Sequence, residues 1–150
     1  LFQEVREKRG LCYTIYAQTG AHAETGMTTI YAGTSADDIN ELAGITLDEL
    51  KRAAHDMSDA EVERARVQMK AGMLMGLESP SSRAERLARM ISIWGRVPDL
   101  DETVQKIEAV TTRQVRDHAA KMASGNIALA QYGPVENALD LDAVRARLAA

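Results

Sequence analysis

The sequence has a single cysteine, Cys12, so no disulfide can form within the chain. Aromatic residues make up only 4%, so a core must be built from aliphatic residues and the seven methionines. No run of 18 apolar residues is present, and we therefore expect no membrane span. The net charge of −4 argues against a nucleic-acid-binding protein, which usually carries a basic surplus. The length of 150 residues suits a single domain, 1–150, with a sizeable core.

The sequence also lacks a recognisable metal site and a glycine-rich phosphate loop. None of the three histidines, His22, His55 and His118, stands at metal-binding spacing from another ligand. We expect His22 in a loop and the other two on exposed helix positions. Cys12 falls in a predicted strand, which favours a buried small apolar residue over a nucleophile.

Hydrophobic patterning predicts an α+β fold, with a partial antiparallel sheet flanked by several helices. A short helix ends at Gly10, and strands over 11–19 and 27–34 form an antiparallel hairpin. Capping boxes at Ser58/Glu61 and Thr111/Gln114 begin two of the helices that follow. The predicted helices are 35–56, 58–77, 82–95, 97–110 and 111–122, before a third strand over 126–133 and a tail, 135–150, that is weakly helical from Leu141 to Ala149.

Two sets of side chains on the predicted helices have simple structural interpretations. Met69, Met73 and Met75 are expected to fill the core. Three arginines stand at spacings of three residues, which favours a solvated helix face over an anion site: Arg83, Arg86 and Arg89.

Arg6 and Tyr13 are the candidate functional residues. On residue type alone, Arg6 is an exposed helix residue and Tyr13 a core aromatic. The spacing allows an alternative, because Arg6 lies one turn before the helix end and Gly10 permits a reversal into the strand that Tyr13 begins. Both side chains donate hydrogen bonds, and together they would suit a carbonyl oxygen that gains negative charge.

Several stretches resemble the second, non-zinc domain of the M16 zinc peptidases, the group of pitrilysin, insulin-degrading enzyme and mitochondrial processing peptidase. They are LFQEVREKRGLCY, ESPSSRAERLARMISIWGRV, IEAVTTRQV and NIALAQYGP. The resemblance runs from Leu1 to about Pro134 and is nearest to the bacterial processing-peptidase-like branch. It implies two related α+β domains, of which the first carries an HxxEH zinc motif. The second contributes an arginine and a tyrosine seven residues apart, which match Arg6 and Tyr13.

The chain departs from the family pattern in having no HxxEH motif. Any zinc is therefore expected in a partner domain, on the same polypeptide or on another. The narrow sheet and the family pattern also lead us to expect a piece of a longer protein, shortened on its N-terminal side, whose missing strands precede Leu1 or come from a partner.

The resemblance implies the substrate-binding half of a zinc metalloendopeptidase, in which Arg6 and Tyr13 hydrogen-bond the scissile carbonyl. Its partners would be a zinc-bearing N-terminal domain or subunit, a peptide substrate and, for this chain by itself, further copies. The alternatives are a degenerate structural or assembly subunit, like the core proteins of the bc1 complex, and a free-standing binding module. The presence of both Arg6 and Tyr13 favours the peptidase. The compartment is open between bacterial cytoplasm and periplasm, with the cytoplasm favoured.

Overall fold

The computed structural model describes residues 1–22 and 24–149. The chain forms two compact units, residues 1–56 with 116–150 and residues 57–115. We call the first the hairpin unit and the second the helical unit. The expectation of one domain over 1–150 stays a prediction.

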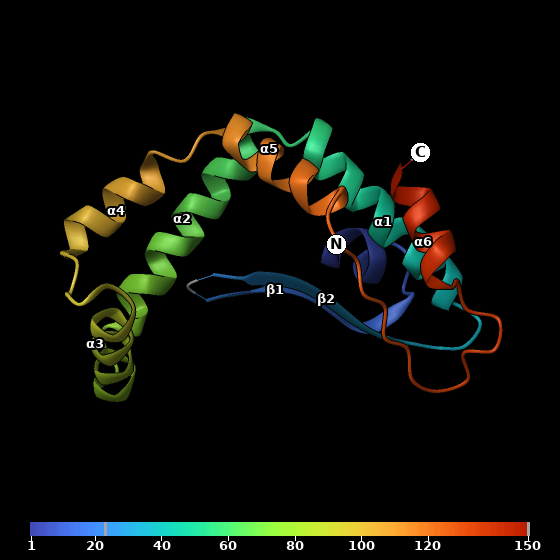
Figure 1. The fold of residues 1–150 in the computed structure, drawn as a ribbon, viewed down its shortest axis with the longest axis horizontal. Helices are drawn as coiled ribbons and strands as arrows, with labels where there is room; N and C mark the ends of the chain where they lie inside the picture. Colours follow the sequence, from blue (N-terminus) through green and yellow to red (C-terminus); the bar gives the residue numbers. More distant parts are fainter. Residues whose placement is uncertain (23, 150) are drawn as a thin grey trace. The chain divides into compact units, whose positions relative to one another are not determined.

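The hairpin unit contains a short π-helix, a two-stranded sheet and helices (Figure 1). The π-helix η1 spans Phe2–Glu7, and the strands β1 and β2 span Cys12–Ala21 and Gly26–Thr34. The strands pair antiparallel from Cys12 opposite Thr34 to Ala21 opposite Gly26, which confirms the predicted hairpin. The helices are α1 (Ile39–His55), the residues of α5 (Thr112–Ala123) from Arg116 onward, and α6 (Leu141–Ala149).

The core of the hairpin unit lies between η1, the inward face of the sheet and α1. Its buried residues are Val5, Leu11, Cys12, Ile15 and Leu42. They are aliphatic apart from Cys12, whose burial is as predicted. Burial also raises the pKa of the Cys12 thiol, because the charged thiolate is poorly solvated there.

Helix α6 packs on α1 through an ion pair and a close approach. The guanidinium of Arg147 lies 2.7 Å from the carboxylate of Asp48, and this hydrogen bond lowers the pKa of Asp48. Gly44 on α1 faces the same guanidinium, and a Cβ atom there would lie 3.1 Å from it. A glycine at this position therefore lets Arg147 lie flat against α1. The tail helix confirms the helical prediction for Leu141 to Ala149, whereas residues 135–140 precede the helix.

The predicted third strand over 126–133 was wrong. In the described part of the chain the sheet has two strands, and these residues have no ladder partner. An alternating apolar pattern indicates an extended segment, but a strand also needs a neighbouring backbone to pair with. The side-chain amide of Gln131 instead donates to the carbonyl oxygen of Leu139 at 3.1 Å.

The helical unit contains α2 (Asp59–Gly76), α3 (Pro80–Trp94), α4 (Leu100–Glu108) and the first residues of α5. Both predicted capping boxes form. Ser58 and Glu61 exchange side-chain and backbone hydrogen bonds at the start of α2, and Thr111 and Gln114 do the same at α5. Helix α3 begins at Pro80, two residues earlier than predicted, because Ser79 caps it and proline suits the first helical position.

Helices α2 and α4 are joined by an ion pair and enclose an apolar cleft. Lys70 lies 2.8 Å from Glu108, and the Nε of Arg66 donates to the carbonyl oxygen of Val110 at 3.1 Å. The cleft between the helices has a volume of about 310 Å³ and includes Met69 in its lining. None of the helices in residues 1–22 and 24–149 is long and apolar enough to cross a membrane.

Two of the three α2 methionines predicted to fill the core do not do so, whereas Met73 is half-buried. Met69 is 60% exposed and Met75 is 69% exposed. Apolar residues lie all around α2, and α4 covers one side of it, so some of them face solvent.

Candidate functional site at the corner between η1 and β1

The corner begins at the end of η1, where the chain reverses. Gly10 has a φ of +67°, a left-handed conformation that glycine adopts without strain, as predicted. Its N–H donates to the carbonyl oxygen of Arg6 at 2.9 Å, and that of Leu11 donates to Val5 at 3.1 Å. The N–H of Lys8 reaches Gln3, five residues back. This wider π-type turn was not predicted, because apolar spacing over six residues does not separate it from an α-helix.

Tyr13 is the extra residue of a β-bulge. Cys12 pairs with Thr34 and Thr14 pairs with Gly33, so Tyr13 has no partner of its own on β2. The bulge lets Cys12 and Ile15, three residues apart, both point into the core. Tyr13 points outward and is 87% exposed. Tyr13 is therefore not a core aromatic, and its hydroxyl is open to solvent.

The structure places Arg6 beside Tyr13. The guanidinium carbon of Arg6 lies 5.8 Å from the centroid of the Tyr13 ring and 4.7 Å from that of Phe2. The two predicted site residues thus meet at the corner, while their role stays a prediction. Phe2 was not predicted as part of this site, although its position four residues before Arg6 is the spacing at which helical side chains meet.

Arg6 differs from the two cations that follow it in having its hydrogen-bond donors free. Lys8 and Arg9 both bond the carboxylate of Glu4, and these bonds lower the pKa of Glu4. The carboxylate nearest to Arg6 is that of Glu7, 3.8 Å from Nη1, which is too far for a hydrogen bond. Within the described residues, the guanidinium of Arg6 donates no hydrogen bond.

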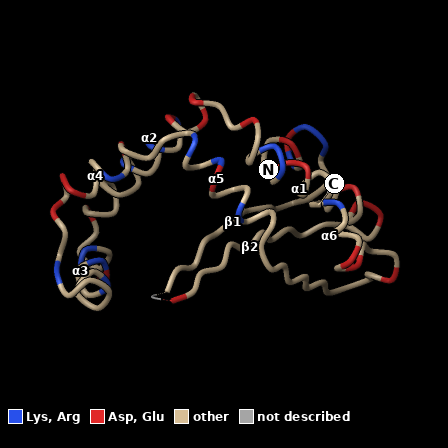
Figure 2. Tube along the Cα trace, turned by 45° about the horizontal axis from the view of Figure 1, so that its top comes forward, with Lys and Arg blue, Asp and Glu red and all other residues tan. Residues whose placement is uncertain are grey.

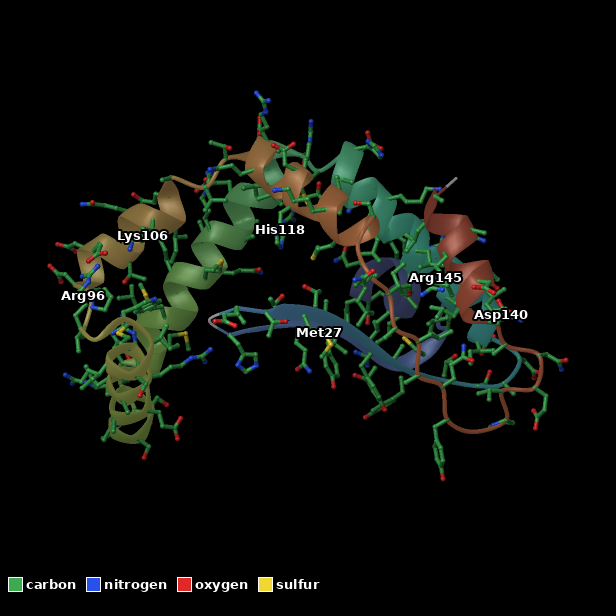
Figure 3. All side chains as sticks on the ribbon, in the orientation of Figure 1. Met27, Arg96, Lys106, His118, Asp140 and Arg145 are labelled. Atoms are coloured by element: carbon green, nitrogen blue, oxygen red, sulfur yellow. The ribbon has the colours of Figure 1, made fainter. Side chains whose placement is uncertain are left out.

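The outward face of the hairpin continues from Tyr13. Tyr16 and Tyr31 are paired across the strands and stack with ring centroids 5.3 Å apart. Met27 projects on the side of the sheet away from α1 (Figure 3). Lys, Arg, Asp and Glu are frequent on the helices and scarce on the strands (Figure 2). The corner is thus bordered by an uncharged, partly aromatic surface.

The histidines lie apart and exposed, with His22 after β1, His55 on α1 and His118 on α5, as expected. Among the residues the structure describes, no three His, Cys, Asp or Glu side chains are grouped to hold a metal ion. These residues do not fit a zinc site. Arg83 and Arg89 are exposed on α3, as in the solvated face that we favoured, whereas Arg86 is half-buried and its Nη2 atom has no hydrogen-bond partner among the described residues.

Comparison with known proteins places this corner in a family. A family profile described as the peptidase M16 inactive domain matches residues 1–69, which include Arg6 and Tyr13. An uncharacterized zinc protease of Streptomyces coelicolor is 33% identical over 138 residues, which are 91% of this chain and 30% of the relative. The chain is thus similar to the M16 peptidase family through its inactive domain. Mitochondrial-processing peptidase subunit beta of Neurospora crassa is 31% identical over 140 residues, 92% of this chain and 29% of the relative.

The chain spans about a third of the length of the curated relatives that it matches. A solved structure with the same fold is a chain of complex III2 from Candida albicans with Inz-5 bound. The TM-score is 0.86 at 20% identity, over 97% of this chain and 35% of that one. This likeness confirms the predicted M16-type α+β fold.

Proposed function

We propose that this chain is the non-zinc, substrate-binding half of a zinc-dependent M16 metalloendopeptidase. In this function, Arg6 and Tyr13 donate hydrogen bonds to the carbonyl oxygen of the scissile peptide bond. The observation that carries the proposal is the corner itself. It brings a phenol and a guanidinium side by side, with Tyr13 87% exposed and the donors of Arg6 uncommitted.

The chemistry of peptide hydrolysis explains why such a pair is useful. When water attacks the carbonyl carbon, the carbonyl oxygen gains negative charge. Donors fixed in advance beside that oxygen stabilise the charge without further reorganisation. Tyr13 offers one O–H and Arg6 offers a planar array of N–H groups. The neighbouring carboxylate of Glu4 is already engaged by Lys8 and Arg9, so it does not compete for Arg6.

Zinc, where the complete peptidase binds it, would polarise the same carbonyl from a partner domain or subunit. The described residues of this chain offer no ligand set for it. The relatives named as zinc proteases are about three times as long as the matched region, which leaves room for a zinc-bearing domain elsewhere. The role of this chain therefore lies in binding the substrate and in donating hydrogen bonds.

The test is steady-state kinetics of Tyr13→Phe and Arg6→Lys in the complete peptidase with a peptide substrate. Each change should lower kcat by roughly 10²–10³-fold, the usual cost of losing such a donor. KM should change little, because the bonds form mainly in the transition state. Lysine should not rescue, since an ammonium lacks the planar fork of a guanidinium.

Two matched variants serve as controls. Tyr16→Phe removes a hydroxyl from the same face of β1, and Arg9→Lys changes a cation in the same corner that bonds Glu4. Both should retain kcat. Full kcat in Tyr13→Phe would contradict the proposal and favour a structural or assembly subunit. The proposal would also be contradicted if the variants lost activity only because they unfold, as a lower thermal midpoint would show.

A further inference from the structure

Phe2 occupies a position that packing alone does not explain. Its ring is 43% exposed and does not belong to the buried core of the hairpin unit. The ring contacts Arg6, whose guanidinium carbon lies 4.7 Å from its centre. A cation over an aromatic face at this distance is attracted by the negative charge of the ring face.

An aromatic ring holds a guanidinium in a different way from a carboxylate. A carboxylate accepts hydrogen bonds from the N–H edge and so occupies the donors. A ring attracts the flat face of the guanidinium and leaves the edge free. Among the described residues, the guanidinium of Arg6 lies over the rings of Phe2 and Tyr13 and approaches the carboxylate of Glu7 to 3.8 Å.

We propose that Phe2 is a positioning residue that holds the guanidinium of Arg6 beside Tyr13 while leaving its N–H groups available to a substrate carbonyl. This inference rests on the proposed function. The geometry supports it in one further respect. Phe2 and Arg6 both lie on η1, whose end is fixed by the buried Val5 and by the backbone bonds at Gly10. The backbone that carries the ring is therefore anchored.

Kinetics in the complete peptidase tests the role of the ring. Phe2→Leu keeps apolar bulk and removes the ring, and it should lower kcat on the order of two- to fivefold with little change in KM. Phe2→Tyr keeps an aromatic face and should retain the wild-type kcat. Glu7→Gln removes the other partner of Arg6 and should leave kcat unchanged, because that exposed pair is weak.

A double variant separates positioning from general packing. If Phe2 acts through Arg6, Phe2→Leu should have no further effect on kcat in an Arg6→Lys background. Thermal melts accompany each variant, and Phe2→Met serves as a second ring-free variant if the leucine variant melts lower.

The possible failures are distinguishable. If Arg6→Lys keeps full kcat, the proposed function fails and this inference fails with it. If Arg6→Lys loses activity while ring-free variants keep the wild-type kcat, only the role of Phe2 is overturned. An undiminished effect of Phe2→Leu in the Arg6→Lys background, or no rescue by tyrosine, would overturn it as well.

Discussion

The hydroxyl of Thr34, the last residue of β2, donates a 2.6 Å hydrogen bond to the carbonyl oxygen of Leu11, the residue before β1. This bond lies beside the bulge at Tyr13 and joins the end of one strand to the start of the other. Leu11 is buried, and its N–H is already bonded to Val5 at the end of η1. The bond from Thr34 thus ties the sheet to the chain reversal that positions Arg6.

Thr34→Val should destabilise the chain because it deletes this hydrogen bond with little change of shape. The expected loss in the free energy of unfolding is about 1 kcal/mol, the usual net value of one such bond. Urea unfolding followed by circular dichroism measures it. Thr29→Val is the matched control, since no described residue bonds the Thr29 hydroxyl. Equal midpoints for the two variants would contradict the prediction.

Stability should depend on pH through Glu102 in the helical unit. Arg96 and Lys106 hydrogen-bond this carboxylate and lower its pKa from 4.5 to about 2. A depressed folded-state pKa gives a contribution that is present above pH 4.5 and is lost as the pH falls toward 2. The thermal midpoint of wild type should therefore exceed that of Glu102→Gln at pH 7, and the difference should shrink below pH 4.5.

The same pair of measurements has an internal control. Glu85→Gln removes a carboxylate of α3 that no described residue pairs with, and its difference from wild type should not show this decline. Because the Glu102 cluster is exposed, added salt should weaken its effect. A wild-type advantage that grows on acidification would be incompatible with the ion pairs described.

The chain by itself should bind no stoichiometric zinc and should hydrolyse no peptide. The reason is the lack of a clustered ligand set in the described residues and of an HxxEH motif in the sequence. Metal analysis of the purified chain, together with a peptidase assay, measures both. About one tightly bound zinc, with activity lost to a chelator, would overturn the prediction.

The chain by itself should also self-associate through the strands. The described sheet has two strands, β1 and β2, so each has one unpaired edge, and neither strand carries a charged residue. Sedimentation at rising concentration should detect the association. Gln18→Lys places a charge on β1 and should reduce it, whereas Gln68→Lys on α2 should not. A monomer at all concentrations would contradict the prediction.

Local patterns predicted most of the secondary structure. The capping boxes at Ser58 and Thr111 correctly predicted where two helices begin, because a capping box depends on residues only three apart. Gly10 gave the reversal because few residues other than glycine adopt its conformation. The meeting of Arg6 and Tyr13 followed from these local rules, since everything between them is a helix end and a turn.

Features that depend on distant contacts were missed. The extended segment after α5 has no described pairing partner, and no local pattern reports this. Met69 and Met75 are exposed because their burial would need other elements to cover α2 there. The bulge left a faint signal. Cys12 and Ile15 are apolar at a spacing of three, which breaks the alternation of a regular strand. The contact of Phe2 with Arg6 could have been inferred from their spacing.

The bulge at Tyr13 makes the corner tolerant of substitution and intolerant of changes in length. Tyr13 points outward because it is the extra residue of the bulge. Substitutions along the rest of β1 should therefore leave its direction unchanged. Removing one residue between Gly10 and Ile15 would cancel the bulge and exchange the two faces at the strand's beginning. A library of single-residue deletions should therefore find that deletions in this short segment are not tolerated. A library of substitutions should find that many replacements are tolerated at the surrounding positions.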